Sequence, residues 1–270
     1  MTNFSFQASS LRALVKLMLP SAESKNMSES NYCTLSVQLR ETVGEDGSLV
    51  RQHVLLAETS QPTFSLAAQL PLTTDGVETD GVAVRVGTRD LDRALASFGQ
   101  KVCTVALTGD GGLRLTTLCQ CGSDGCPVGH PVKEVLVKGQ AMALQELPEV
   151  ISADCVLPDM LPLLDGLRAA VDIAATRGNG LKMQGVRVEW SPGCLYVEGA
   201  NPGVKAVTSY DDPWQVVPAE GRSCVVTTDA VRHVIAALSA YGIGSQLRMR
   251  LESRVLTVQT ELVTVMCDVN

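Results

Sequence analysis

The chain has 270 residues, of which 45% are hydrophobic, 4% aromatic and 19% charged, and its formal net charge is −7. This length predicts two domains, because single domains average ~100–150 residues. The negative charge argues against a protein that coats nucleic acid with a generally basic surface but leaves room for a local basic face, and no run of ~18 apolar residues predicts a membrane span.

The first predicted helix follows a short strand. In residues 4–20, FSFQASSLRALVKLMLP, an alternating strand leads through Ser9 or Ser10, as the helix N-cap, into a helix. The three- and four-residue spacing of its apolar residues predicts one buried face. This stripe consists of Leu11, Leu14, Val15 and Met18.

The second and fourth predicted helices lie in segments that match each other. Residues 82–118 and 223–262 each contain a β-branched strand, a threonine N-cap (Thr88; Thr227 or Thr228), a one-sided helix and two alternating strands. A constant offset of this kind is typical of an internal repeat. Leu91, Leu95 and Phe98 match Val231, Ile235 and Leu238, each 140 residues later, and Leu107 matches Leu247 at the same offset.

The third predicted helix lies in residues 154–200. Two strands, Met183–Trp190 and Cys194–Gly199, follow it and are joined by a turn at 191–193, Ser-Pro-Gly. The order of elements, a strand, a helix and then further strands, is the same as around the first predicted helix. The apolar stripe of this third helix consists of Met160, Leu164, Leu167, Val171 and Ala174.

The chain therefore reads as four copies of a strand, helix and strands unit, grouped in two halves. Four helices are too few for a parallel fold in which strands and helices alternate. An α+β fold is predicted, with antiparallel sheets covered on one face by paired helices. The expected domains are residues 1–138 and 153–270, joined by a linker at 139–152.

The polar sides of the predicted helices are basic. One basic helix would be no more than an ordinary solvated face, but four of the same sign in an acidic chain indicate a surface that meets an anionic partner. Asp92, Asp165 and Asp172 dilute the pattern, most of all on the third helix. The basic residues are Arg12 and Lys16 on the first helix, Arg89 and Arg93 on the second, Arg168, Arg177 and Lys182 on or after the third, and Arg232 on the fourth.

These segments resemble the DNA polymerase sliding clamps. Residues 181–207, 225–238 and 262–270 are similar to the middle domain of the bacterial β clamp, and residues 84–98 resemble the same template. The resemblance covers nearly the whole chain and rests on order and spacing. It implies the DNA-clamp fold, with sheets outside and helices lining a central hole. It also implies a non-enzymatic ring that encloses double-stranded DNA without sequence preference and tethers DNA polymerase and clamp-loader peptides.

The sequence departs from the bacterial clamp in two ways. The bend at 199–206, GANPGVKA, lacks the acidic residue of the family, and the sequence holds two domains where the bacterial clamp has three. Two domains per chain is the plan of eukaryotic, archaeal and some phage clamps, so the resemblance implies a homotrimeric ring and is compatible with a phage source. Leu144, Leu147 and Val150 are expected to border a groove for partner peptides.

A cysteine cluster stands at 119–130, CQCGSDGCPVGH. It falls between two expected strands, Leu113–Leu118 and Val132–Val137. The equivalent segment of the second copy, 259–263, is much shorter, so the cluster is an insertion at a loop tip. The spacing is close to that of a zinc knuckle. Two interpretations of the cluster remain, a structural Zn²⁺ site and a loop of free thiols. Four protein ligands would leave no position for substrate, so a metal here would not imply catalysis. No cofactor is expected to be required, and a structural Zn²⁺ is possible. The ligand set would be Cys119, Cys121, Cys126 and His130.

Other features favour neither catalysis nor secretion. The glycine-rich 108–112, TGDGG, fits a hairpin turn better than a phosphate loop, and His53 and His233 are isolated. Six cysteines are scattered singly and are expected to be buried small hydrophobes, and the N-terminus lacks the order of a secretory signal, so a cytoplasmic protein is expected. A zinc-bearing protein-interaction adaptor is the main alternative function; an enzyme is disfavoured because no acid, base and nucleophile set is visible.

Overall fold

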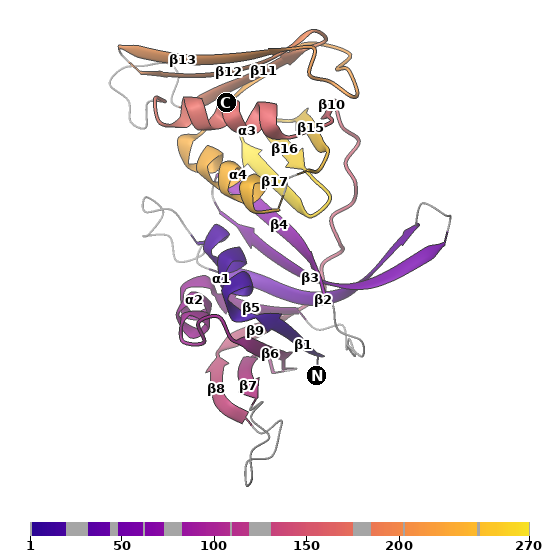
Figure 1. Ribbon diagram of the computed structural model, residues 1–270, viewed down its shortest axis with the longest axis vertical. Coiled ribbons are helices and arrows are strands. Elements are labelled where there is room, and N and C mark those ends of the chain that lie inside the picture. Colours follow the sequence, from indigo (N-terminus) through magenta and orange to yellow (C-terminus); the bar gives the residue numbers. More distant parts are fainter. Residues whose placement is uncertain are drawn as a thin grey trace. The chain divides into compact units, whose positions relative to one another are not determined.

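A computed structural model of the chain describes residues 2–19, 32–43, 48–61, 63–72, 83–108, 110–118, 131–174, 185–201, 203–241 and 244–269. The chain divides into two compact units, one formed by Met1–Ser60 and Ala67–Leu147 and the other by Gln61–Leu66 and Pro148–Asn270. In the described residues each unit contains two helices and antiparallel sheets (Figure 1). The predicted α+β class is confirmed.

The first unit has two sheets. One has the order β1-β6-β7-β8; the other has the order β3-β2-β5-β9, with β4 next to β3. The strand β9 lies within the stretch that was expected to be a linker. The elements are β1 (Thr2–Gln7), α1 (Ala8–Leu17), β2 (Tyr32–Val43), β3 (Leu49–Ser60), β4 (Phe64–Pro71), β5 (Ala83–Gly87), α2 (Thr88–Ala96), β6 (Val102–Leu107), β7 (Leu113–Leu118), β8 (Pro131–Val137) and β9 (Gly139–Met142).

The second unit repeats this plan. Its sheets have the orders β10-β15-β16-β17 and β13-β12-β11-β14. The elements are β10 (Cys155–Leu157), α3 (Leu161–Val171), β11 (Val186–Ser191), β12 (Cys194–Asn201), β13 (Val204–Asp211), β14 (Arg222–Val226), α4 (Thr228–Tyr241), β15 (Leu247–Glu252), β16 (Val255–Gln259) and β17 (Val263–Asp268).

The two repeats inside each unit exchange their first strands. In the first unit β1 pairs with β6 and β5 pairs with β2; in the second β10 pairs with β15 and β14 pairs with β11, all antiparallel. The strand before each helix thus pairs with the first strand after the other helix. Because the backbone hydrogen bonds of one repeat are completed by the other, the folding unit is the pair of repeats.

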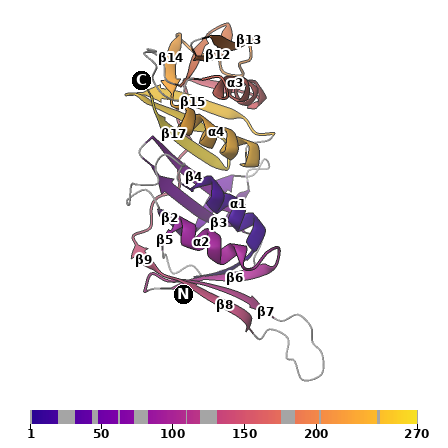
Figure 2. The same ribbon diagram turned by 90° about the vertical axis from the view of Figure 1, so that its left-hand side faces the viewer.

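The predicted helix stripes form the core. Helices α1 and α2 lie side by side in the first unit and α3 and α4 in the second (Figure 2), with their apolar residues turned inward. All stripe residues are at most 6% exposed except Ile235, which is half-buried. The residue 140 positions before Val234 is Ala94, and both are buried, so the offset holds for the helix face the structure buries.

Two of the predicted helix starts are wrong. Helix α1 begins at Ala8 with Gln7 as N-cap, so Ser9 and Ser10 lie inside the helix; α2 begins at Thr88 with Gly87 as N-cap. Neither N-cap makes a side-chain capping bond. In α4 the prediction of Thr227 is confirmed, because its Oγ1 accepts from the Ala230 N–H at 3.3 Å.

The hairpin turns are as predicted in two places. Strands β6 and β7 pair through the turn at 108–112, where the Thr108 N–H donates to the Gly112 carbonyl (2.9 Å), and β11 and β12 pair across 191–193. The longest pair, β2 and β3 with 12 residues each, was not among the predicted elements. No helix in the described part of the chain is long and apolar enough to cross a membrane.

Candidate nucleic-acid interface

The exposed side of the α1–α2 pair carries four basic residues. Arg12 reaches from α1 to Asp92 on α2, with Nε 2.8 Å from Oδ1, and the two side chains are 35% and 20% exposed. Lys16, one turn further along α1, is exposed and has no ion-pair partner among the described residues. The Arg12–Asp92 pair is therefore partly desolvated and ties the two helices together, whereas Lys16 is free to meet an anion.

On α2 the two arginines also differ. Arg89 is exposed and, within the described chain, unpaired. The Arg93 Nη1 lies 3.7 Å from Asp90 Oδ1, and both side chains are more than 70% exposed. A pair so exposed contributes little and holds its charge weakly. With Asp90 and Asp92 opposed to four cations, the α1–α2 surface has a net positive charge of two.

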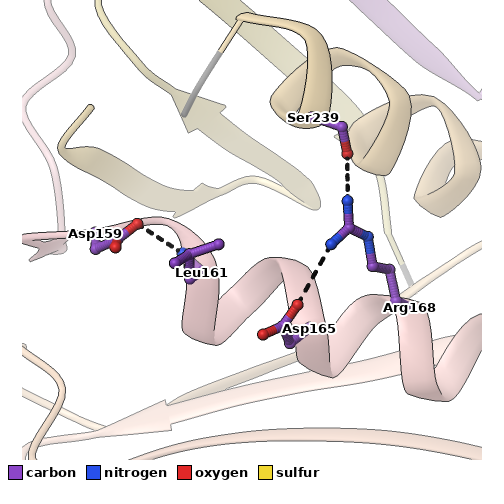
Figure 3. Close-up of polar contacts among 5 residues, drawn as sticks. All are labelled: Asp159, Leu161, Asp165, Arg168 and Ser239. Carbon is purple, nitrogen blue, oxygen red and sulfur yellow. Dashed lines mark hydrogen bonds and ion pairs between the residues drawn. The ribbon is translucent and has the colours of Figure 1, made fainter. Parts of the chain in front are cut away.

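The α3–α4 pair is closer to neutral. Arg168 on α3 lies between two partners (Figure 3): its Nη1 is 3.4 Å from Asp165 Oδ1 and its Nη2 donates to Ser239 Oγ on α4 at 2.9 Å. Arg232 on α4 is exposed and has no ion pair within the described residues. Asp165 and Asp229 balance these two arginines on the helices themselves.

Two predicted basic residues, Arg177 and Lys182, lie outside the described residues. The structure also adds contacts that were not predicted, namely those of Asp90 and Ser239. Asp90 precedes Arg93 by three residues, a spacing at which helical side chains meet, so the sequence carried a signal for that pair. No sequence signal joins Arg168 to Ser239, which lie 71 positions apart.

The linker residues proposed for partner peptides are accessible. Leu144 is 43% and Val150 69% exposed, and Leu147 is half-buried. The backbone around them is held on both sides: within the first unit Gln38 Nε2 donates to the Gln145 carbonyl at 2.7 Å, and within the second Gln259 Nε2 donates to the Glu149 carbonyl at 2.8 Å. Leu144 is thus next to a backbone group held within the first unit, and Val150 is next to one held within the second.

The described cysteines contribute to packing and not to a reactive site. Cys33, Cys103, Cys155, Cys224 and Cys267 are buried as predicted, while Cys194 is half-buried, and all six are free. Burial raises the pKa of the Cys155 and Cys224 thiols to about 12, so they stay protonated and unreactive at neutral pH. No group of His, Cys, Asp or Glu in the described residues could hold a metal ion. The predicted ligands Cys119, Cys121, Cys126 and His130 lie outside the described residues.

His233 does not stand alone on the helix surface. Within the second unit its ring stacks on Phe64, with ring centroids 3.9 Å apart and an interplanar angle of 23°. Such a contact is typical of a packing residue.

Comparison with known proteins identifies the fold. No family model and no curated protein matches the sequence. Among solved structures, the DNA polymerase III β subunit of Pseudomonas aeruginosa is 13% identical with a TM-score of 0.69, covering 99% of this chain and 64% of its own. The β subunit of Thermotoga maritima is 12% identical with a TM-score of 0.68, covering 100% and 64%.

A third structure, the Helicobacter pylori β clamp bound to a DNA ligase peptide, is 12% identical with a TM-score of 0.67 and covers 99% of this chain and 66% of its own. The chain thus has the fold of the bacterial β sliding clamp along nearly its whole length. It spans slightly less than two thirds of the clamp chains that it matches.

Proposed function

We propose that the protein is a sliding clamp, a non-enzymatic ring that encloses double-stranded DNA and tethers replication proteins to it. The observation that carries the proposal is the match of nearly the whole chain to β clamps at TM-scores of 0.62–0.69. The net positive charge of the α1–α2 surface, in a chain of net charge −7, supports it independently, since a DNA-facing surface must attract phosphates.

Enclosure does not need tight contact. A closed ring remains on DNA because it cannot leave sideways, so a few cations are enough to keep it near the phosphate backbone without stopping its movement. The modest charge of the helix surfaces fits this requirement better than it fits a protein that holds DNA by affinity, which uses many phosphate contacts.

Ring closure would use the strands at the ends of the four-stranded sheets. Strand β8 ends one sheet in the first unit and carries Val132 and Leu136, 59% and 58% exposed; β13 ends a sheet in the second unit and carries Val204 and Val207, 54% and 47% exposed. Apolar strands at a sheet edge are ready to pair with another chain. We propose that β8 of one copy pairs with β13 of the next, which makes a ring of three copies from two-unit chains.

The partners and the location follow from the same proposal. The H. pylori clamp binds a peptide of DNA ligase, and we propose that short apolar segments of a polymerase and a clamp loader bind this chain at a surface that includes Leu144, Leu147 and Val150. A cytoplasmic protein that works at a replication site, including that of a phage, is consistent with this function. A structural Zn²⁺ at the cysteine cluster would be an addition to the clamp and not its purpose.

The deciding experiment tests enclosure. Protomers are mixed with nicked circular plasmid at low concentration, concentrated to close rings, and passed through a sizing column at high salt. Protein that stays with the circle and leaves when a restriction enzyme linearises it is topologically bound. Three 28.6-kDa chains, about 86 kDa by light scattering, are expected without DNA. A monomer at micromolar concentration that leaves circular and linear DNA equally would refute the proposal.

A further inference from the structure

The basic residues of the α1–α2 surface fall into two classes. Arg12 is committed to Asp92 through the shortest ion pair on the helices, 2.8 Å, with both side chains partly buried. Lys16 and Arg89 are exposed and unpaired among the residues that the structure describes. A cation already neutralised by a carboxylate offers DNA far less than a free one.

Both free cations lie on the same side of the pair, because α1 and α2 run in opposite directions: Ala8 at the start of α1 donates to the carbonyl of Lys101, which follows α2. Lys16 follows Arg12 by four residues on α1, and Arg89 precedes Asp92 by three on α2, and both spacings put side chains on the same helix face. The neutral Arg12–Asp92 pair thus lies one helical turn from Lys16 and one from Arg89. Arg12 therefore belongs to the same helix surface as the free cations, and its ion pair with Asp92 decides whether its charge adds to theirs.

Resting on the proposed function, we propose that Asp92 attenuates the DNA contact: it withholds Arg12 from the phosphate backbone and leaves Lys16 and Arg89 as the cations by which α1 and α2 touch DNA. The role belongs to a positioning residue that sets the strength of contact. The chemistry is a competition between a carboxylate and a phosphate for one guanidinium, and the carboxylate has the advantage of being held 2.8 Å away by packed helices.

The test compares Asp92→Asn, Arg12→Gln/Asp92→Asn and Lys16→Gln by measuring affinity for a short linear duplex from about 50 to 200 mM salt. Each phosphate contact adds about 0.9 to the slope of log affinity against log salt, or about a 3.5-fold loss across this range. Asp92→Asn is expected to bind more tightly and with a slope steeper by about 0.9, because Arg12 is freed. Lys16→Gln should be shallower by the same amount.

The double variant Arg12→Gln/Asp92→Asn distinguishes the outcomes most clearly. Removing both members of a neutral pair should leave affinity and slope at the wild-type values, whereas an Arg12 that touches DNA would make the double variant as weak as Lys16→Gln. Asp268→Asn is the matched control, since it makes the same charge change at an exposed residue of β17, which is neither a helix nor one of the two strands proposed to close the ring. The double variant also tests the proposal if Asp92→Asn alone fails to fold.

The outcomes separate this proposal from the one on which it rests. Wild-type protein without duplex affinity at about 50 mM salt, a condition that favours phosphate contacts, would show that α1 and α2 do not touch DNA and would overturn the role of Asp92, whereas the proposed function stands or falls with the enclosure experiment. Wild-type protein that binds, together with an Asp92→Asn variant no tighter than Asp268→Asn or a double variant as weak as Lys16→Gln, overturns only the role of Asp92.

Discussion

The two units have the same topology but join their helices to the rest of the fold by different means. In the second unit α3 sits very close to its sheet: a Cβ on Gly166 would lie 2.8 Å from Val197 Cγ2, and one on Gly199 would lie 2.0 Å from the Ala170 carbonyl oxygen. Helices α1 and α2 contain no glycine and are tied to each other by Arg12 and Asp92.

The difference shows which features the repeated fold requires. Both units keep the strand exchange and the apolar stripe, while among the described residues the close helix–sheet approach occurs in the second unit and the ion pair between helices in the first. The same fold is reached with two sets of packing contacts, so the two halves can diverge in surface charge without losing the scaffold. This freedom allows the helix surface of one unit to carry a net positive charge and that of the other to be nearly neutral.

The largest expected effect is on the stability of the second unit. Gly199→Ala places a methyl group against the backbone of α3, which cannot turn aside as a side chain can, and we expect a loss of about 3 kcal/mol. Denaturant unfolding measures it. Gly193→Ala is the control in the same sheet, because a Cβ there meets nothing within 4 Å. Equal stability of the two variants would show that α3 has room to move and would remove this difference between the units.

The local patterns of the sequence predict the scaffold and miss what depends on tertiary position. The stripe from Leu11 to Met18 and the 140-residue offset from Leu91 to Val231 are enough to predict four helices in two halves, because burial imposes its period on the chain. The prediction missed β2, although Cys33, Leu35, Val37 and Leu39 alternate with polar residues there. It also missed β3, in which four consecutive residues are buried and the alternation is lost.

The site is harder to predict than the scaffold. Basic residues can be assigned to helix faces from their spacing, but whether a given arginine is free depends on a partner such as Asp92, 80 residues away from Arg12. The closeness of these two residues is decided by how α1 and α2 pack. Likewise the N-cap of α2 is Gly87 and not the predicted Thr88, a difference of one residue that depends on where β5 ends.

The next effect concerns DNA binding by the two helix pairs. Lys16→Gln/Arg89→Gln removes two free cations from the first unit and should lower the salt dependence of duplex binding by about 1.8. Arg168→Gln/Arg232→Gln removes the same formal charge from the second unit, but Arg168 is already engaged by Asp165 and Ser239, so a decrease of about 0.9 or less is expected. Identical losses would mean that both units contact DNA equally.

The third difference lies in the last hairpin of each unit. Strands β16 and β17 are joined by a tight turn in which the Thr260 N–H donates to the Val263 carbonyl (2.8 Å), whereas β7 and β8 are joined by 119–130. Metal analysis of the purified chain distinguishes the two interpretations of that insertion. A zinc site predicts about one Zn²⁺ per chain, lost in Cys126→Ser with a local loss of stability and unchanged DNA affinity. Free thiols predict no zinc and rapid titration of Cys119, Cys121 and Cys126.

The smallest expected effect is a pair of opposite pH dependences on equivalent strands. Glu58 on β3 has its pKa raised above 4.5 by burial. Burial also acts to raise the pKa of Glu198 on β12, but bonds from Lys205 (2.8 Å) and Tyr196 (2.9 Å) outweigh it and hold the pKa below 4.5. Glu58 therefore contributes stability that is complete below pH 4.5 and lost as pH rises through its folded pKa. Glu198 contributes stability that is complete above pH 4.5 and lost as pH falls through its folded pKa.

Unfolding midpoints of the wild type, Glu58→Gln and Glu198→Gln between about pH 3 and 7 test this pair, since each variant removes one titration. The stability of the wild type relative to Glu58→Gln should increase as the pH is lowered towards 4.5. Its stability relative to Glu198→Gln should decrease only below pH 4.5. The window distinguishes the two because general acid unfolding affects all three proteins alike. Parallel pH profiles for the two variants would show that the two strands place their carboxylates in the same environment, contrary to the difference in their partners.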